Sequence, residues 1–377
     1  MIWIFWLAFG FLCYPFVGYP LLLWVLSLVW GREHQQAPIR PSVSIIIAVF
    51  NGEKQIAAKL SNTLELDYPE NLLEILVASD GSNDRTAEIV KTFSDRGVKL
   101  VEIPERRGKH YAQMVARDAS RGEILVFTDV SVILGPEALQ RIVSNFADSA
   151  IGCVSSEDRE LGAMRGFTGE GAYLRFDQWL RRLESRLSSV VSLSGSFFAA
   201  RRQVCTKWHP RQSSDFFIAL HSVTAGLRAI VDPESHGWYS LRTGDRDEFS
   251  RKVRTVVHGL DVFFTHLEVL NPFRYGLFPV NLISHKFVRW VVPFALLGLL
   301  VSNIFLCQAG LFYQLCLMGQ GLALFTSLLG LIFSRLQEFR LIRLAVYFTS
   351  GNLATVSAWI KFCGGVRFAS WEPTQRA

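Results

Sequence analysis

A thirty-residue run without a charged side chain limits the fold of this chain more than any other feature. Residues 1–30 contain no Asp, Glu, Lys or Arg, and a helix that spans a bilayer needs about 20 consecutive apolar residues. The run lacks the basic start of a secretory signal peptide and is longer than that peptide's apolar core. We therefore predict a retained N-terminal transmembrane helix over residues 1–31.

Two further runs near the C-terminus are also long enough to cross a bilayer. Residues 287–307 and 311–333 are almost entirely apolar and are joined by a short uncharged turn. A third run, 344–362, is weakened by the polar residues Thr349, Ser350, Asn352, Thr355 and Ser357. A crossing helix, a re-entrant helix and a helix packed inside the bundle stay open for it. We predict C-terminal transmembrane helices within residues 287–363 and a tail over 364–377.

The distribution of positive charge predicts the orientation. The first charged residue is Arg32, and further arginines follow the second C-terminal run. Because Lys and Arg are enriched in cytoplasmic loops, we predict an inner-membrane, multi-pass protein whose central domain, between the apolar ends, is cytoplasmic. The chain has a net charge of +6 but no block of Lys and Arg residues. We therefore assign the positive charge to loops facing membrane lipid and predict no nucleic acid partner.

Between the apolar ends, the chain alternates between short apolar segments and helical stretches. The segments 43–49, 73–79, 98–103 and 124–128 are typical of buried strands. Glycines end a helical stretch immediately before a strand at positions 97, 122 and 226. Helix, glycine and strand in repeated succession predict βαβ units. We therefore expect an α/β domain with a mostly parallel, doubly wound sheet over residues 42–260.

After residue 260 the sequence becomes amphipathic, and prolines interrupt it at positions 272 and 279. We predict interfacial amphipathic helices over residues 261–286. A helix that closes the preceding domain is the alternative.

Asp129 follows the buried segment 124–128 directly. In open α/β sheets, ligands bind outside the carboxyl ends of the strands, and a carboxylate there suits a divalent cation that bridges to phosphate oxygens. The alternative is an aspartate that caps the helix after Pro136.

Asp80 and Gly81 follow another predicted strand in the same way. A carboxylate at a strand end can accept hydrogen bonds from a nucleotide base, and a glycine lets the backbone turn sharply beside a ligand. A turn with a helix cap at Asp84 is the alternative.

Lys109 belongs to a basic group, Arg106-Arg107-Gly108-Lys109, at the start of a predicted helix. Cations are unfavourable at a helix N-terminus, whereas anions are attracted to its free N–H groups. A bound phosphate would explain the group, and a solvated basic loop is the alternative.

Three residues nearer the C-terminus have both a chemical and a structural interpretation. Asp215 starts a helix, where it is either a general base or a cap for that helix. Arg251 and Arg254 either neutralise a diphosphate leaving group or bind lipid head groups. The lone histidines His209, His236 and His258 are weaker candidates for a third metal ligand.

Taken together, these motifs resemble the membrane-bound inverting glycosyltransferases of family two, which have the GT-A fold and include cellulose, chitin and hyaluronan synthases and ceramide glucosyltransferase. The motifs occur in the family's order as SIIIAVFNGE, VASDGSNDRT, RRGKHYAQ, VFTDVSV, SGSFFAARR and SSDFFIAL. The resemblance covers residues 42 to about 259 and the membrane frame. It implies a GT-A nucleotide-diphospho-sugar transferase domain with transmembrane helices at both ends.

The resemblance also implies a role for each matching residue. Asp80, with Gly81, would contact the uracil of a UDP-sugar, and Asn51 and Glu53 would line the nucleotide pocket. Lys109 would approach the phosphates.

For the reaction centre, the resemblance implies that Asp129 would hold Mg²⁺ or Mn²⁺ and that Gly195 and Ser196 would border the sugar. Asp215 would be the catalytic base, and Arg254, together with Arg251, would stabilise the departing diphosphate.

Three positions depart from the family pattern. Ser131 replaces the second aspartate of Asp-x-Asp, and Ser214 replaces the acidic residue before the base. The Gln-x-x-Arg-Trp signature of processive synthases reads RKVRT over residues 251–255, so the tryptophan that stacks on a growing polymer is absent. This difference favours the addition of one sugar.

These observations predict an inverting, hexosyltransferase-like enzyme that moves a sugar from a nucleotide donor, expected to be a UDP-sugar. The acceptor would be a lipid-linked or polysaccharide molecule of cell-envelope or exopolysaccharide synthesis, in a possible envelope-synthesis complex. Two alternatives stay open. One is a polyprenyl-phosphate or ceramide-type lipid glycosyltransferase, and the other is a non-catalytic sugar-nucleotide-binding membrane subunit.

Overall fold

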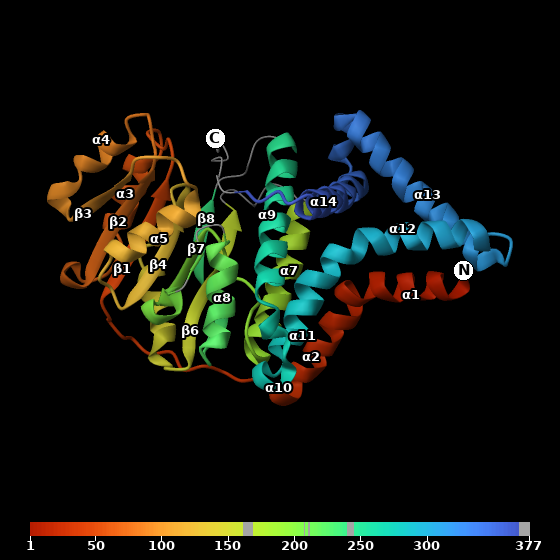
Figure 1. The fold of residues 1–377 in the computed structure, drawn as a ribbon, viewed down its shortest axis with the longest axis horizontal. Coiled ribbons are helices and arrows are strands. Elements are labelled where there is room, and N and C mark those ends of the chain that lie inside the picture. Colours follow the sequence, from red (N-terminus) through yellow and green to blue (C-terminus); the bar gives the residue numbers. More distant parts are fainter. Residues whose placement is uncertain (161–168, 207, 210–211, 240–244, 369–377) are drawn as a thin grey trace.

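The computed structural model describes the chain except for residues 161–168, 207, 210–211, 240–244 and 369–377 (Figure 1). A layered α/β domain lies at one side of the molecule, and long helices extend away from it at the other (Figure 1).

The domain is built on an eight-stranded mixed sheet in the order β3-β2-β1-β4-β7-β6-β8-β5. The strands, in chain order, are β1 Val43–Val49, β2 Leu73–Asp80, β3 Val98–Ile103, β4 Ile124–Asp129, β5 Val132–Leu134, β6 Ile151–Glu160, β7 Phe197–Arg201 and β8 Arg228–Tyr239. Strands β3, β2, β1 and β4 are parallel, β7 is antiparallel to both its neighbours, and β6 is parallel to β8. The predicted fold class, an α/β domain with apolar helices at both ends, is confirmed.

Side chains of β1 explain why both faces of the sheet are covered. All seven residues of β1 are buried, and successive side chains of a strand point to opposite faces. Ile45 and Ile47 pack in one cluster with residues of α3 (Ile56–Leu64), α4 (Thr86–Lys91) and α6 (Ala138–Ser144). Ile46 packs in another, with residues of α5 (Lys109–Ala119) and α8 (Ser214–Thr224). A continuous run of apolar residues is therefore what a strand between two helical layers requires.

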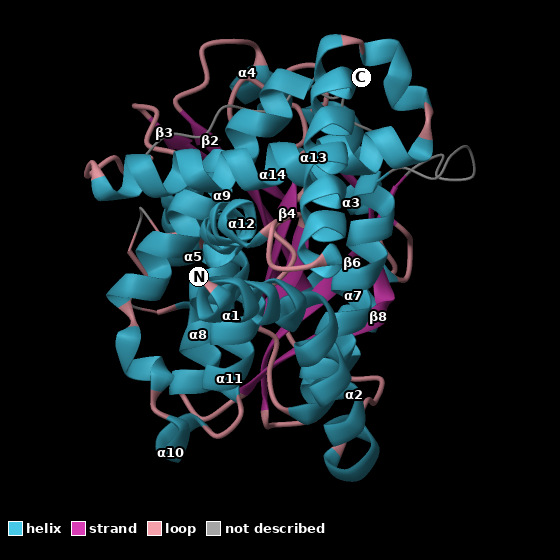
Figure 2. Cartoon of the chain, turned by 90° about the vertical axis from the view of Figure 1, so that its right-hand side faces the viewer, coloured by secondary structure: helices cyan, strands magenta, loops and turns pink. Residues whose placement is uncertain are grey.

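Two long helices connect this domain to the apolar ends of the chain. Helix α7 (Gly169–Leu187) contacts α2 (Tyr19–Trp30), and α9 (Asp245–Thr265) contacts α14 (Arg340–Cys363). The short helices α10 (Pro272–Tyr275) and α11 (Phe278–Leu282) follow α9. Figure 2 views this helical side of the molecule with the sheet behind it.

Within the described part of the chain, three helical segments are long and apolar enough to cross a membrane: Ile2–Trp30, Phe278–Leu306 and Leu311–Ile332. The first comprises α1 (Ile2–Cys13), a π-helical turn and α2, and the second comprises α11, another π-helical turn and α12 (Val288–Leu306). The third is α13. Helix α1 lies along α12, and Figure 1 places the N-terminus beside the α12–α13 turn. The orientation of these helices relative to a membrane stays a prediction.

The fourth apolar run forms α14, which packs along α9 and α13. Its buried residues include Val346, Ala354 and Ala358, while Leu341 and Ile360 are exposed. Helix α14 therefore packs against other helices, and whether residues 344–362 cross a membrane, re-enter it or lie inside the bundle stays a prediction.

The segment predicted to lie on the membrane surface begins inside a helix. Helix α9 continues through residue 261 to Thr265, and its Val262 and Phe263 are buried with Phe278 and Leu282 of α11. Phe216 of α8 belongs to the same cluster. This packing favours the domain-closing alternative for the start of the segment, and contact with a membrane stays a prediction.

Candidate active site

Three of the predicted site residues are brought to one edge of the sheet by the parallel register of its central strands. Val49 of β1 pairs with Ser79 of β2, and Ala48 pairs with Asp129 of β4. The carboxyl ends of the three strands therefore lie side by side. Asn51, Asp80 and Asp129 follow or end them at the edge where ligands bind in this class of fold.

Asn51 and Glu53 brace the loop that follows β2. The side-chain oxygen of Asn51 accepts a hydrogen bond from the backbone N–H of Asn83 at 3.0 Å, and the backbone N–H of Asn51 donates to Ser82 Oγ at 3.1 Å. Glu53 Oε2 accepts from the backbone N–H of Arg85 at 3.2 Å. Asn51 has φ 48°, a conformation that asparagine tolerates better than most residues. In this structure both residues therefore shape the predicted nucleotide pocket.

Asp80 holds the next loop in place. Its two carboxylate oxygens accept hydrogen bonds from the backbone N–H groups of Arg107 and Gly108, at 2.8 and 2.7 Å. Gly81 beside it has φ 66°, and a Cβ on it would lie 2.5 Å from the backbone nitrogen of Arg106. Only glycine fits this close approach. The contact between Asp80 and a nucleotide base stays a prediction.

Lys109 links the end of β4 to the turn before β7. Its Nζ lies 2.5 Å from Asp129 Oδ1 and donates a hydrogen bond to the backbone oxygen of Gly195 at 2.8 Å. The neighbouring arginines lie over aromatic rings, Arg106 over Phe50 and Arg107 over Tyr111, each at 4.0 Å. Lys109 is therefore the cation of this basic group that enters the site.

Asp215 also lies beside the turn before β7 that contains Gly195. One carboxylate oxygen accepts a hydrogen bond from Ser213 Oγ, and a Cβ on Gly195 would lie 3.5 Å from Asp215 Oδ2. Lys109 and Asp215 thus both adjoin Gly195, and Lys109 is paired with Asp129. The predicted metal ligand and the predicted base therefore lie in one site.

Asp158 of β6 is a carboxylate of this site that sequence reasoning missed. Its Oδ1 accepts hydrogen bonds from Ser194 Oγ at 2.7 Å and from Ser196 Oγ, while the backbone N–H of Asp129 donates to Ser196 O at 2.9 Å. Burial raises the pKa of Asp158, and the negative charge of Asp129 raises it further. The available signal was its position after the apolar segment 151–154, which resembles the other strand ends.

Sequence reasoning also missed Lys59, which holds the segment that contains Asp129. This buried lysine of α3 donates hydrogen bonds to Thr128 Oγ1 at 3.0 Å and to Val132 O at 2.7 Å. It therefore joins the two ends of the segment that carries Asp129. Burial lowers the pKa of Lys59 to about 7, although the charge of Asp129 opposes the shift. Nothing in its sequence position distinguishes it from a solvated lysine.

The donor atoms at Asp129 and Asp158 fit a divalent cation. In the described part of the chain, no group of three or more His, Cys, Asp or Glu residues converges on one point. Mg²⁺ is commonly held by one or two carboxylates, with waters and substrate phosphates completing its shell. Asp158 adds a carboxylate from another strand to the region of Asp129, and the negative charge of Asp129 is within electrostatic range of it. Binding of a cation by these two carboxylates stays a prediction.

The residue that departs from the family pattern before Asp215 has a packing role. Ser214 is buried, its Oγ donates to Gln113 Oε1 at 2.8 Å, and its backbone N–H donates to His110 Nδ1 at 3.2 Å. Burial lowers the pKa of His110 well below its usual value, and the nearby His258, Lys109 and Arg254 lower it further.

Helix α9 supplies the two predicted arginines. The charge of Arg254 reaches His110, and His258 of the same helix lies edge-on to the His110 ring with centroids 5.7 Å apart. Arg251 lies one turn before Arg254 and is partly buried. Both arginines are thus carried by the helix that borders the site, and their contacts with a diphosphate stay predictions.

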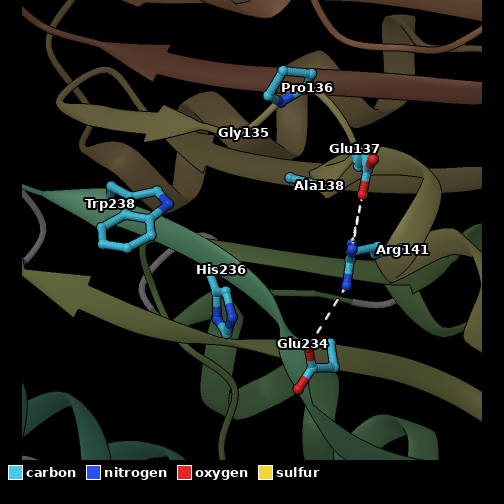
Figure 3. Close-up of a pocket in the computed structure, with 8 residues that line it drawn as sticks. All are labelled: Gly135, Pro136, Glu137, Ala138, Arg141, Glu234, His236 and Trp238. Atoms are coloured by element: carbon cyan, nitrogen blue, oxygen red, sulfur yellow. Dashed lines mark hydrogen bonds and ion pairs between the residues drawn. The ribbon is translucent and has the colours of Figure 1, made fainter.

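A hollow of about 400 Å³ lies away from these residues (Figure 3). It is lined by Gly135, Pro136, Glu137, Ala138, Arg141, Glu234, His236 and Trp238. Glu137 and Glu234 each form an ion pair with Arg141 across it. None of the predicted site residues is among those that line it, and His236 is placed there rather than beside Asp129.

Comparison with known proteins agrees with this geometry. Residues 44–208 match the model of the family described as Glycosyl transferase family 2. This match agrees with the family that the sequence motifs resemble. The matched range includes Asp80, Lys109, Asp129 and Gly195 and ends before Asp215.

The curated relatives are glycosyltransferases of several kinds. A beta-monoglucosyldiacylglycerol synthase of Nostoc sp. is 27% identical over 203 residues, which are 50% of this chain and 43% of that protein. A poly-beta-1,6-N-acetyl-D-glucosamine synthase of Staphylococcus epidermidis is 27% identical over 175 residues, which are 45% of this chain and 41% of that protein. The chain thus spans less than half the length of these relatives.

A solved structure extends the likeness to the whole chain. The mannosyltransferase PcManGT from Pyrobaculum calidifontis, in complex with GDP-Man and Mn²⁺, has a TM-score of 0.75 and 23% sequence identity. The alignment covers 96% of this chain and 99% of that one. At this identity the likeness shows the fold, and it includes the terminal helices as well as the sheet domain.

Proposed function

We infer that this chain transfers one sugar, with inversion, from a nucleotide-diphosphate donor to a lipid-linked or glycan acceptor at the cytoplasmic face of the inner membrane. The observation that carries this inference is the chain of contacts from Asp129 through Lys109 and Gly195 to Asp215. A cation ligand for the donor and a base for the acceptor have to flank one reacting carbon, and these residues lie in one site.

The donor side is formed by the loops after β1 and β2. Asn51 and Glu53 shape the pocket, and the loop that Asp80 fixes leads into the N-terminus of α5, whose N–H groups suit phosphate. The sequence predicts UDP, whereas PcManGT was solved with GDP-Man. The identity of the nucleotide is therefore the first variable to test.

In the reaction, the acceptor hydroxyl oxygen attacks the anomeric carbon while the bond to the donor diphosphate breaks. Asp215 takes the hydroxyl proton, and Lys109 and Arg254 stabilise the negative charge of the departing diphosphate. Mg²⁺ or Mn²⁺ held by Asp129 and Asp158 would supply further charge neutralisation to that leaving group. Ser194 and Ser196 orient the Asp158 carboxylate through their hydroxyl groups.

The test uses the full chain in lipid nanodiscs with a panel of labelled UDP- and GDP-sugars and extracted membrane lipid as acceptor. Asp215→Asn should lower transfer by roughly 10²–10⁴-fold, the usual contribution of a general base, with donor binding retained. Asp118→Asn is the matched control, because Asp118 is exposed and pairs with Arg117 on the same helix. Equal transfer by wild type and Asp215→Asn would remove the assignment.

A non-catalytic subunit that binds sugar nucleotides is the second candidate. Ser131 and Ser214 favour it, because both replace acidic residues of the family pattern. Donor binding without transfer or hydrolysis for any sugar of the panel would support this function.

A further inference from the structure

A group of ionisable side chains lies buried where the catalytic domain meets the start of α12. His285 Nδ1 lies 2.7 Å from Glu184 Oε1, and His285 Nε2 lies 3.1 Å from Asp177 Oδ1. Arg289 Nη1 lies 2.8 Å from the same oxygen of Asp177, and Tyr19 donates a hydrogen bond to Glu184 at 2.7 Å. One oxygen of each carboxylate therefore has two partners, whereas Glu184 Oε2 has none among the described residues.

The histidine of this group contacts a carboxylate through each of its two ring nitrogens. An imidazole ring has one donor and one acceptor nitrogen, and only the protonated ring donates from both. Both nitrogens of His285 face carboxylate oxygens. Although burial favours the neutral acid, His285 and Arg289 hold the pKa of Asp177 well below its usual value.

Lys286 differs from these residues because it has no partner of this kind. Among the described residues, its ammonium group forms no hydrogen bond or ion pair, and its recorded contact is with the ring of Phe216, 5.6 Å from the centroid. A cation–π contact leaves the three N–H donors of an ammonium group unpaired. Asp177, Arg181, Asp215 and Arg289 are the charged groups within electrostatic range of it.

The position of Lys286 relates it to the acceptor side of the reaction. Phe216 directly follows Asp215 at the start of α8, so Lys286 lies beside the proposed base. Lys109 and Asp129 are linked to Asp215 through Gly195. Asp215 is also within electrostatic range of Lys286, which contacts the ring of the next residue, Phe216.

Lys286 also lies in the first third of Phe278–Leu306, a helical segment that is long and apolar enough to cross a membrane. It belongs to the π-helical turn between α11 and α12, where the chain leaves the domain and enters the extended helices (Figure 1). Beyond Arg289, α12 is apolar to its end, with Leu297, Ile304 and Phe305 exposed. Cations at the start of an apolar helix meet the phosphate region of a bilayer.

Arg181 and Arg289 add positive charge near Lys286, and both are within electrostatic range of it. Arg181 Nη2 donates to Ser155 Oγ at 2.7 Å and to Ser192 O at 3.0 Å, and its charge also reaches Asp158. In the described part of the chain, Arg289 Nε and Nη2 have no hydrogen-bond partner. Three cations are thus gathered near Asp215 and the start of α12.

We propose that Lys286, between Arg181 and Arg289, binds the phosphate of a lipid-linked saccharide acceptor and so presents a sugar hydroxyl of that acceptor to Asp215. The assignment rests on the proposed function and names its acceptor class. The acceptor oxygen forms the new bond to the anomeric carbon, the donor diphosphate leaves with its electron pair, and the hydroxyl proton goes to Asp215. The phosphate bound by Lys286 is not consumed.

The experiment compares two acceptors that differ in the phosphate alone: an isoprenyl diphosphate-linked N-acetylglucosamine and the isoprenyl glycoside of the same sugar. The full chain is tested in phosphatidylcholine nanodiscs. Lys286→Gln should raise KM for the phosphate-bearing acceptor by roughly ten- to a hundred-fold, the usual worth of a hydrogen bond to a charged group. Its kcat/KM for the neutral glycoside should equal that of wild type.

Two further variants separate charge from folding. Lys286→Arg keeps the charge and should restore KM to within about threefold, since a guanidinium also binds phosphate. Lys91→Gln on α4 is the control, because Lys91 is exposed and pairs only with Glu102 in the described contacts. Equal losses for both acceptors in Lys286→Gln, or unchanged KM for the phosphate-bearing one, would overturn the proposal.

Binding of the phosphate-bearing acceptor without donor keeps this test independent of turnover. If wild type transfers no sugar, the proposed function fails, yet tighter binding by wild type than by Lys286→Gln still supports the phosphate site. Equal binding by the two proteins refutes it. If Lys286 bound bulk anionic lipid instead, adding phosphatidylglycerol to the nanodiscs would abolish the difference between the variants, and that result would also refute the acceptor assignment.

Discussion

His110 offers the sharpest test of how the site is held together, because it must stay neutral to perform its contact. Its Nδ1 accepts a hydrogen bond from the backbone N–H of Ser214 at 3.2 Å, which positions the first turn of α8 and thereby Asp215. A protonated ring cannot accept this bond. Burial lowers the pKa of His110 well below its usual value, and the neighbouring His258, Lys109 and Arg254 oppose a further positive charge.

The direction of the pH effect follows from proton linkage. Below a pH of about 6.5, the unfolded chain binds a proton at residue 110 that the folded chain does not bind, so stability rises with pH in this range. Each pH unit between the folded and unfolded pKa values changes the free energy of unfolding by about 1.4 kcal/mol. Lowering the pH from about 8 to about 5 should therefore lower the stability through His110, by at most about 2 kcal/mol.

His110→Asn isolates this contribution, because the asparagine oxygen can accept the Ser214 bond and does not titrate. Equilibrium denaturation of both proteins in the same detergent, followed by circular dichroism, gives the difference in unfolding free energy at each pH. Between about pH 8 and about pH 5, the free energy of unfolding of wild type should fall by up to roughly 2 kcal/mol more than that of His110→Asn. A difference that stays constant over this range would refute the assignment of a neutral, buried His110.

Two further predictions concern the donor side of the site. Gly81→Ala should weaken donor binding at least roughly tenfold, because the left-handed conformation costs about 1–2 kcal/mol for alanine and the new Cβ would also meet the backbone of Arg106. Gly97→Ala is the control, because Gly97 has a similar φ but open space around it. Calorimetry with the donor would show equal losses of affinity in the two variants if the clash were unimportant. Asp158→Asn should weaken Mn²⁺ binding to the donor-loaded protein at least roughly tenfold, as measured by Mn²⁺ paramagnetic resonance. Asp118→Asn should leave it unchanged, and an Asp158→Asn protein with wild-type Mn²⁺ affinity would show that the second carboxylate is not a ligand.

The parallel half of the sheet could be predicted because its strands carry their own signal. The predicted segments 43–49 and 98–103 coincide with β1 and β3, and 73–79 and 124–128 fall one residue short of β2 and β4. Strands covered by helices on both faces are continuous apolar runs, and several of them directly follow a glycine. Both signals can be read from a short stretch of sequence.

The other half of the sheet lacks such a pattern. Strand β8 contains Pro233 and five polar or charged residues among its twelve, and β6 and β8 pair with register shifts. Its strands are defined by neighbours that are distant in sequence, so composition and periodicity carry little information about them.

The same contrast explains which site residues could be predicted. Asp80 and Asp129 stand immediately after apolar segments, and Lys109 starts the helix that follows another one, so the βαβ rule carries all three to one edge of the sheet. Asp158 reaches that edge from β6, which is separated from β4 by β7. A spacing motif such as Asp-x-Asp assumes that both carboxylates come from one turn. When Ser131 takes the second position, another strand can supply the carboxylate, and only the strand order reveals it.

Lys286 is the clearest case in which a residue's meaning depends on what surrounds it. In the sequence it is one basic residue before an apolar run, which the positive-inside rule already explains. The structure adds that the neighbouring carboxylates are held by other groups, and that the side chain of Phe216 places Lys286 beside the base. A partly buried lysine that lies beside Asp215 and whose ammonium group has no ion pair among the described residues is suited to bind an anion. Specificity for a phosphate-bearing acceptor thus follows from a contact that only the tertiary structure creates.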